Sequence, residues 1–261
     1  MTQLNLTDRL HQITLPPEAH RWAQLFASKQ SDVPTGKQVY YNTLSVFAVD
    51  DYLHTLGIAT NLEDSDSWYP GLTSPPDSAE LKLVDLGAIE CRPVLAAATE
   101  VVLPFPGDEI AYVVVQLSAD LDTVTFCGYA PANTTGTIAL ASLRPIEYLT
   151  NYLGKLRDGV DRLENLDLEQ FDPLMSEFLA ELSDRGMLSL IARSIPIYES
   201  SARKLSKKLE ISELFGSNFA GVGIQRSANA EQRSLAELQQ EDKIRNLAEG
   251  WLEILNQIFI A

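Results

Sequence analysis

The fold of this chain is decided by residues 111–129, which read AYVVVQLSADLDTVTFCGY. The segment up to Leu117 is rich in β-branched and aromatic residues, and residues 123–129 alternate between apolar and polar positions. Both patterns are typical of strands, and the polar residues between them are typical of a turn. The stretch therefore predicts two paired strands, at 109–118 and 122–130.

More strands are expected on either side of this pair. Residues 81–85 and 89–92 flank Gly87 and predict a hairpin, and residues 138–140 predict a short edge strand. Successive strands with short turns leave no room for crossover helices, so we expect antiparallel pairing. Two amphipathic helices, at 17–29 and 37–56, precede the strands.

After the strands, the chain has helical periodicity and acidic or glycine-bearing joints. We predict helices at 145–157, 173–183, 186–210 (bent at Pro196) and 229–259. The expected fold class is α+β, with N-terminal helices packed on a small antiparallel sheet and an all-helical C-terminal region. The expected boundaries are 1–150 for the α+β domain and 151–261 for the helices.

The charge balance limits the partners that the protein can have. The chain has 36 acidic and 20 basic residues, a formal net charge of −16. Such a surface repels phosphate backbones and anionic lipid headgroups, and no run approaches the roughly 18 apolar residues of a membrane span. We expect no nucleic-acid partner and no membrane association. The N-terminal residues lack a signal-peptide pattern, so we expect a cytoplasmic location.

Motifs that carry chemistry are missing from the sequence. The three histidines have no second ligand-type residue at metal-site spacing, and no nucleophile elbow or phosphate-binding loop is found. Cys91 and Cys127 are expected as buried, reduced thiols. We therefore expect no cofactor, no metal and no catalytic residue, and the chain is more typical of a non-enzymatic protein.

Two short segments offer candidate binding residues. In the loop 61–70, Asp64 and Asp66 lie next to Trp68 and Tyr69. An acidic cluster beside two aromatic residues is typical of a solvated loop with aromatic plugs, and it also occurs at a pocket rim or a contact surface.

The second segment surrounds Cys91, with Glu90 before it and Arg92 after it. The arginine could polarise the thiol, and an apolar-rich strand equally suits a core position for the cysteine. Glu90 and Arg92 complete the candidate binding residues. A basic run at 203–208 is typical of a solvated helix face, and a functional one would dock on the acidic first region or an acidic partner.

Four segments of the first region form a familiar pattern: residues 40–46 (YYNTLSV), 62–68 (LEDSDSW), 90–94 (ECRPV) and 111–117. In this order they resemble a cyanobacterial family catalogued as domain of unknown function 1822, and the resemblance covers about residues 10–150. It implies a cyanobacterial cytosolic protein and brings no catalytic residues. The helices at 151–261 are either a divergent continuation of this pattern or an appended module.

Three hypotheses for the function follow. The favoured one is a non-enzymatic interaction or regulatory protein, in which an apolar stripe at 244–259 supplies a surface for a protein partner. The second is a small-molecule sensor with a pocket between the sheet and the helices at 17–56, lined by Trp68, Tyr69 and Arg92. The third is an enzyme that uses carboxylates.

Overall fold

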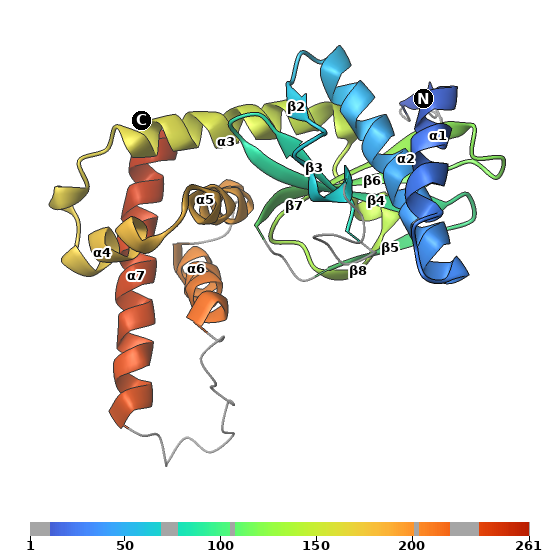
Figure 1. Cartoon of the computed structure of the whole chain (residues 1–261). Coiled ribbons are helices and arrows are strands. Elements are labelled where there is room, and N and C mark those ends of the chain that lie inside the picture. Colours follow the sequence, from blue (N-terminus) through green and yellow to red (C-terminus); the bar gives the residue numbers. More distant parts are fainter. Residues whose placement is uncertain (1–10, 69–77, 105–107, 201–203, 220–234, 261) are drawn as a thin grey trace, which may run out of the picture. The chain divides into compact units, whose positions relative to one another are not determined.

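The computed structural model describes residues 11–68, 78–104, 108–200, 204–219 and 235–260. The chain forms two compact units, Met1–Lys155 and Leu156–Ala261, coloured blue to yellow-green and yellow to red in Figure 1. In the described residues a short strand and two helices come first, the middle is rich in strands, and helices come last. The fold is therefore α+β.

Unit 1 contains a six-stranded sheet. From one edge to the other, its strands are β1 (Gln12–Thr14), β7 (Thr123–Pro131), β6 (Glu109–Leu117), β4 (Gly87–Leu95), β3 (Glu80–Leu83) and β2 (Thr60–Asn61). All neighbours pair antiparallel except β4 and β6, which are parallel. The two edge strands are the shortest, which limits pairing with other chains.

The predicted small antiparallel sheet is wrong, because the sheet has six strands and mixed pairing. The connection between the parallel strands β4 and β6, residues 96–108, contains β5 (Glu100–Leu103). This strand pairs with β8 (Gly136–Ala139) in a separate two-stranded sheet. A crossover needs about a dozen residues, and here a strand of the second sheet provides it instead of a helix.

The two faces of the large sheet have different covers. Helix α2 (Val33–Thr55) contacts β4 and β6, and its Tyr52 ring lies 4.6 Å from the Phe126 ring of β7. The two-stranded sheet packs through Val101 and Leu103 against a core cluster that includes Val114 of β6. Successive strand residues point to opposite faces, so the sheet lies between α2 and β5–β8.

The two N-terminal helices begin with proline-bearing first turns. Helix α1 (Pro17–Ala27) begins with Pro17, and α2 carries Pro34 in its first turn. The Asp32 carboxylate accepts a hydrogen bond of 2.9 Å from the Thr35 amide, which caps α2. Figure 1 shows the two helices side by side.

At Gly128, β7 lies very close to the backbone of Arg144. Its φ is +137°, and an added Cβ would lie 2.3 Å from the Arg144 carbonyl oxygen. Tyr129 exchanges backbone hydrogen bonds with Arg144 at this point. Only glycine fits this close approach. The short helices η3 (Leu140–Ser142) and η4 (Ile146–Tyr148) then lead into α3 (Leu149–Glu164).

Unit 2 is built from helices in its described part. They are the last part of α3, then η5 (Leu168–Gln170), α4 (Pro173–Glu181), α5 (Asp184–Glu199), α6 (Lys204–Phe219) and α7 (Leu235–Ile260). The single helix predicted at 186–210 is two helices. Pro196 lies in the last turn of α5, which ends three residues later at Glu199.

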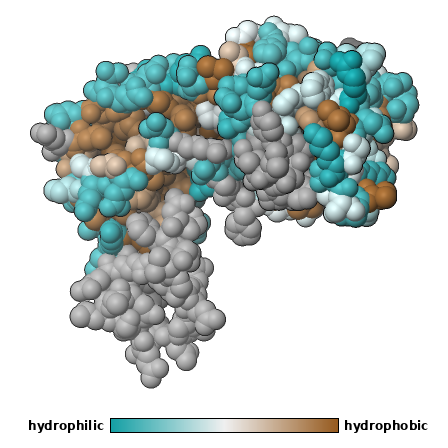
Figure 2. All heavy atoms as spheres, viewed as in Figure 1, coloured by the Kyte–Doolittle hydropathy of each residue, from teal (hydrophilic) through white to brown (hydrophobic). Residues whose placement is uncertain are grey.

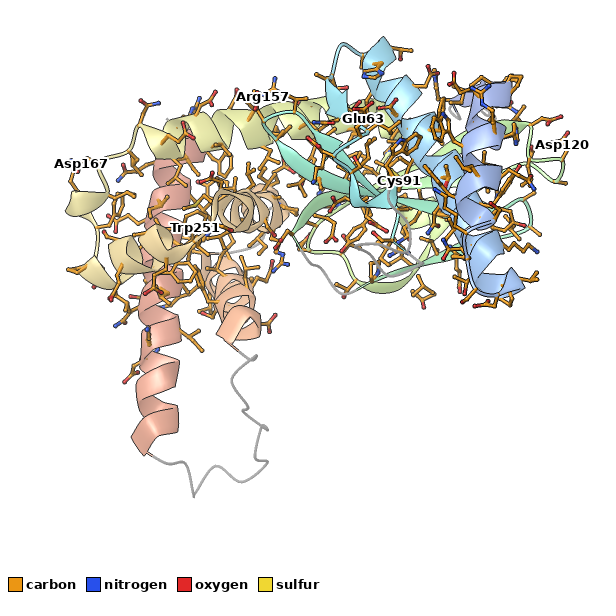
Figure 3. The ribbon with its side chains drawn as sticks, in the orientation of Figure 1. Glu63, Cys91, Asp120, Arg157, Asp167 and Trp251 are labelled. Carbon is orange, nitrogen blue, oxygen red and sulfur yellow. The ribbon has the colours of Figure 1, made fainter. Side chains whose placement is uncertain are left out.

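The apolar stripe of α7 is buried within unit 2. Leu247, Trp251, Leu255 and Ile258 have almost no exposed surface. The Trp251 indole, labelled in Figure 3, donates a hydrogen bond of 2.8 Å to the hydroxyl of Ser194 on α5. Apolar residues also gather on the face of unit 2 seen in Figure 2.

None of the helices in the described residues is both long enough and apolar enough to cross a membrane.

Candidate functional site

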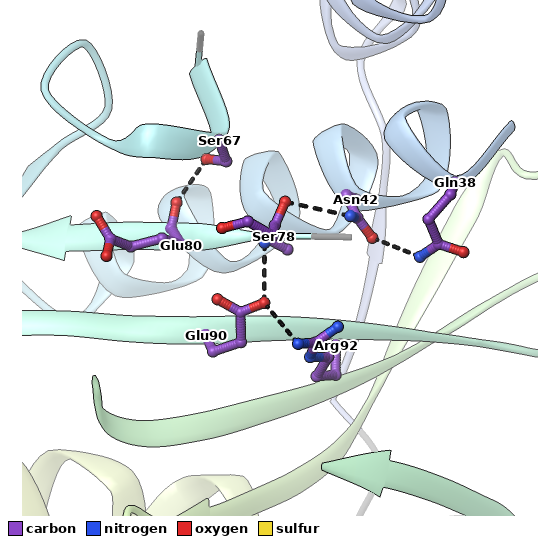
Figure 4. Close-up of polar contacts among 8 residues, drawn as sticks. Gln38, Asn42, Ser67, Ser78, Glu80, Glu90 and Arg92 are labelled. Atoms are coloured by element: carbon purple, nitrogen blue, oxygen red, sulfur yellow. Dashed lines mark hydrogen bonds and ion pairs between the residues drawn. The ribbon is translucent and has the colours of Figure 1, made fainter. Parts of the chain in front are cut away.

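Glu90 and Arg92 form an ion pair on β4. They are two residues apart on one strand, so their side chains share a face of the sheet. The Arg92 Nη2 lies 3.2 Å from the Glu90 Oε1. Glu90 is 3% exposed, whereas Arg92 is partly buried. Figure 4 shows the pair beside the start of β3.

The Glu90 carboxylate also binds the backbone that leads into β3. Its Oε1 accepts a hydrogen bond of 2.8 Å from the Ala79 amide. The Ala79 carbonyl in turn accepts a hydrogen bond of 2.8 Å from the Cys91 amide. Both backbone polar groups of Ala79 are therefore bonded to β4, the amide through the Glu90 side chain and the carbonyl through the Cys91 amide.

A second carboxylate, Glu80, lies directly across from Glu90. The two residues are partners in the β3–β4 register, and Glu80 is 5% exposed. Burial raises the pKa of Glu90 to about 7, with the charges of Glu109 and Glu80 adding to the rise. The Arg92 charge and the Ala79 amide act in the opposite direction and offset only part of it.

Helix α2 contributes a neutral contact to the same segment. The amide nitrogen of Asn42 donates a hydrogen bond of 3.2 Å to the Ser78 carbonyl, and Gln38 donates one of 2.9 Å to the Asn42 side-chain oxygen. Asn42 is buried, so this short chain of hydrogen bonds satisfies polar groups inside the protein.

The acidic–aromatic loop lies on the other side of β3 from β4. Asp64 is exposed, and its carboxylate accepts a hydrogen bond from Asn61 at 2.5 Å. The Asp64 carbonyl accepts one from the Lys82 ammonium, and the Ser67 hydroxyl donates to the Glu80 carbonyl. These contacts stabilise the turn and fasten it to β3, which is a structural role.

Trp68 belongs to an aromatic cluster with the N-terminal helices. Its ring centroid lies 5.2 Å from that of Phe26, 5.7 Å from that of Trp22 and 6.4 Å from that of Phe47. Such edge and tilted contacts are typical of core packing. Trp68 therefore packs against α1 and α2, whereas Arg92 pairs with Glu90 on β4.

The structure thus brings together two of the predicted site residues, Glu90 and Arg92. Asp64 and Trp68 lie in the loop on the outer side of β3. The backbone of Asp66 is part of η2 (Asp66–Trp68), and its side chain is outside the described part. Tyr69 lies outside the described residues altogether.

Both cysteines carry free thiols. Cys91, labelled in Figure 3, is fully buried, and burial raises its pKa well above the usual range. Burial also raises the pKa of Cys127 to about 11. Thiols with raised pKa values are weak nucleophiles at neutral pH, which argues against the polarised Cys91 considered from the sequence. Their strands, β4 and β7, are separated by β6 in the sheet.

A hydroxyl, an imidazole and a carboxylate meet where α2 approaches β2. The Thr60 Oγ1 lies 3.0 Å from the His54 Nε2, and the His54 Nδ1 lies 3.7 Å from the Asp50 Oδ2. The order resembles a catalytic triad. However, the Thr60 hydroxyl donates its one proton to the Asp50 carboxylate, so His54 does not receive it. The cluster therefore fixes β2 on α2.

Sequence reasoning missed Glu80, Asn42 and the Ala79 amide as members of the site. Glu80 could have been found from the predicted hairpin. The turn pairs Leu83 with Gly87, and counting outward from this pair places Glu80 opposite Glu90. The contact of Asn42 joins segments 36 residues apart, and no local pattern indicates it.

The described residues hold no group of three or more histidine, cysteine, aspartate or glutamate side chains that could bind a metal ion. The fold and the site define an α+β protein with a largely buried carboxylate–guanidinium pair on an inner strand of its sheet.

The chain belongs to the family described as "Protein of unknown function (DUF1822)", whose model matches residues 13–251. The match includes most of unit 1 and most of unit 2. No curated protein and no solved structure matches the chain.

Proposed function

We propose that the protein is a non-enzymatic interaction or regulatory protein and that one face of α6 is its contact surface. The observation that carries this proposal is the exposure of two leucines on that helix. Leu205 is 70% exposed and Leu209 is 59% exposed. They are four residues apart, so they lie on the same face of the helix and form one apolar surface.

The other face of α6 attaches the helix to unit 2, so Leu205 and Leu209 are not needed for this packing. Ile211, Leu214 and Phe215 are buried, and α6 packs against α5 and α7. The helix thus has an inner apolar face that contributes to the core of unit 2 and an outer pair of leucines. Single exposed apolar residues are common, but a neighbouring pair on one helix is a better candidate for a partner.

The charges beside the leucines favour an acidic partner. Lys204 is exposed next to Leu205. Lys208 pairs with Glu249, and the Lys207 ammonium donates to the Tyr198 carbonyl, so these two lysines already have partners in unit 2. We therefore infer a protein partner that presents apolar side chains with a carboxylate placed to meet Lys204.

The apolar stripe at 244–259 lends no support to this proposal. Its central residues are used within unit 2, as the burial of Trp251 and Leu255 demonstrates. The partner surface is therefore placed on α6 instead. The proposal includes a cyanobacterial cytosol as the setting, because the family resemblance implies it and two free cysteines suit a reducing compartment.

A double substitution on α6 tests the proposal. Leu205→Ser with Leu209→Ser removes the apolar surface, and Val102→Ser is the matched control, since Val102 is 68% exposed on β5. Proteins retained from a cyanobacterial lysate are identified by mass spectrometry for the wild type and both variants. The retained protein is then purified, and its binding to the three chains is measured by calorimetry.

We expect the purified partner to bind the wild type and the Val102→Ser control equally and the α6 variant at least about tenfold more weakly. Equal binding by all three chains would show that α6 is not the surface. Self-association of the wild type, measured by light scattering and lost in the α6 variant, would replace the acidic partner with a second copy of the chain.

A further inference from the structure

The anchoring of β3 depends on a group that can gain or lose a proton. β3 has four residues, and among the described residues the strand outside it is β2, which has two. Short edge strands have few ladder hydrogen bonds and open more easily than central strands. The hydrogen bond that the Glu90 side chain accepts from the Ala79 amide therefore adds to the few ladder bonds that attach this edge to β4.

The charges around Glu90 are unevenly balanced. Arg92 is the cation beside it on β4, Glu80 faces it from β3, and Glu109 acts on it from β6. Tyr112 of β6 is its register partner on the other side. From α2, the neutral Asn42 contacts Ser78, and the charge of Asp50 reaches the adjacent Cys91. The ammonium of Lys82, two residues from Glu80, is directed to the Asp64 carbonyl.

We propose that Glu90 is a proton-controlled anchor, which holds β3 and β2 on β4 when it is protonated and lets them open more often when it is ionised. An ionised Glu90 places a second negative charge directly across from Glu80, and both residues are almost fully buried. Like charges at directly paired positions destabilise a sheet, and a buried charge favours any opening that hydrates it.

The direction of the pH effect follows from the two states. In the closed state burial raises the pKa of Glu90 to about 7, whereas a hydrated carboxyl in the open state has its ordinary pKa near 4.5. The closed state therefore binds the proton more tightly. As the pH rises from 4.5 to 7, the closed state loses this advantage, and opening becomes more frequent.

Hydrogen exchange of single amides measures this opening. The amides of Ala79 and Cys91 report on the anchored edge, and the amide of Phe126, which donates to the His11 carbonyl, reports on the opposite edge. Exchange is followed by NMR at pH 5 and pH 8 and corrected for the intrinsic rates. We expect the opening constant at Ala79 and Cys91 to rise about tenfold to a hundredfold, with a much smaller change at Phe126.

Two variants assign the effect to the carboxyl. Glu90→Gln keeps the shape and a side-chain oxygen for the Ala79 amide but cannot ionise, so the rise at Ala79 and Cys91 should fall below about twofold. Glu63→Gln, at an exposed position in the neighbouring loop, is the matched control and should behave as the wild type.

The proposal is overturned if the wild type shows no rise at Ala79 and Cys91, or an equal rise at Phe126. These two results need no variant, so they decide the question even if Glu90→Gln folds poorly. A rise that persists in a folded Glu90→Gln protein also overturns it, because another group would then be responsible.

Discussion

The two units of the molecule each bury a polar contact, but only one of these contacts can change its charge. In unit 1 the Glu90 carboxylate accepts from the Ala79 amide, and in unit 2 the Trp251 indole donates to the Ser194 hydroxyl. Both contacts satisfy buried polar groups. The comparison teaches that equal burial has different consequences, because the carboxylate couples the stability of its surroundings to pH and the neutral pair does not.

The largest effect is expected from removing Trp251. It is fully buried on α7, and its loss leaves a cavity and removes the donor to Ser194, whose hydroxyl keeps its own hydrogen bond to the Leu190 carbonyl. Trp251→Ala should lower the free energy of unfolding of unit 2 by about 3–5 kcal/mol, measured by hydrogen exchange of the α5 and α7 amides. Unchanged exchange in those helices would mean that the indole does not hold unit 2 together.

A comparable effect in unit 1 is expected from a backbone site. Gly128→Ala would place a methyl group against the Arg144 carbonyl oxygen at a φ that L-residues avoid, and we expect a loss of about 3 kcal/mol in urea unfolding. Gly136→Ala is the matched control, since φ is +82° but nothing lies within 4 Å of the added Cβ. Its expected loss is about 1 kcal/mol. Equal losses would contradict the close approach at Gly128.

The pH dependence of stability sharpens the contrast between the units. The folded pKa of Glu90 is raised to about 7 from 4.5, so its contribution is fully present below pH 4.5 and is lost as the pH rises through 7. At about 1.4 kcal/mol for each pKa unit, the contribution is on the order of 3 kcal/mol.

Glu90→Gln should therefore be more stable than the wild type at pH 8 and similar to it at pH 4, as measured by urea unfolding of unit 1 at both pH values. Parallel pH profiles of the two proteins would show that Glu90 is ionised at little cost in the folded chain.

The smallest effect concerns the neutral contact of unit 2. Ser194→Ala leaves the Trp251 indole N–H without its acceptor, and we expect a loss of about 1–2 kcal/mol that is the same at pH 5 and pH 8. Thermal unfolding at the two pH values measures it. A loss that depends on pH would remove the distinction drawn between the two units.

The sequence predicted the positions of helices and strands far better than it predicted which strands pair with each other. The helices near Pro17 and the strands at 109–117 and 123–131 are where periodicity predicted them. The parallel pairing of β4 with β6 could not be predicted, because it depends on where β5 goes, and β5 pairs with β8 some 35 residues later. A local pattern does not report such contacts.

The candidate site was predictable only where it depends on neighbouring residues in the sequence. The order Glu90–Cys91–Arg92 was visible, and alternation along a strand places the first and third side chains on one face. The stripe of α7 was visible as well, but periodicity shows only that a face is apolar and not what covers it. Leu255 could therefore not be assigned to the core or to a partner surface from the sequence.

The measurement that tests the account most directly is the titration of Glu90 itself. The ¹³C chemical shift of its side-chain carboxyl is followed by NMR from pH 4 to pH 9 in the full chain, with the exposed Glu63 as the reference. The account predicts a midpoint near pH 7 for Glu90. A midpoint near 4.5 would contradict it, because the buried carboxyl would then be ionised throughout the neutral range and could not act as a proton-controlled anchor.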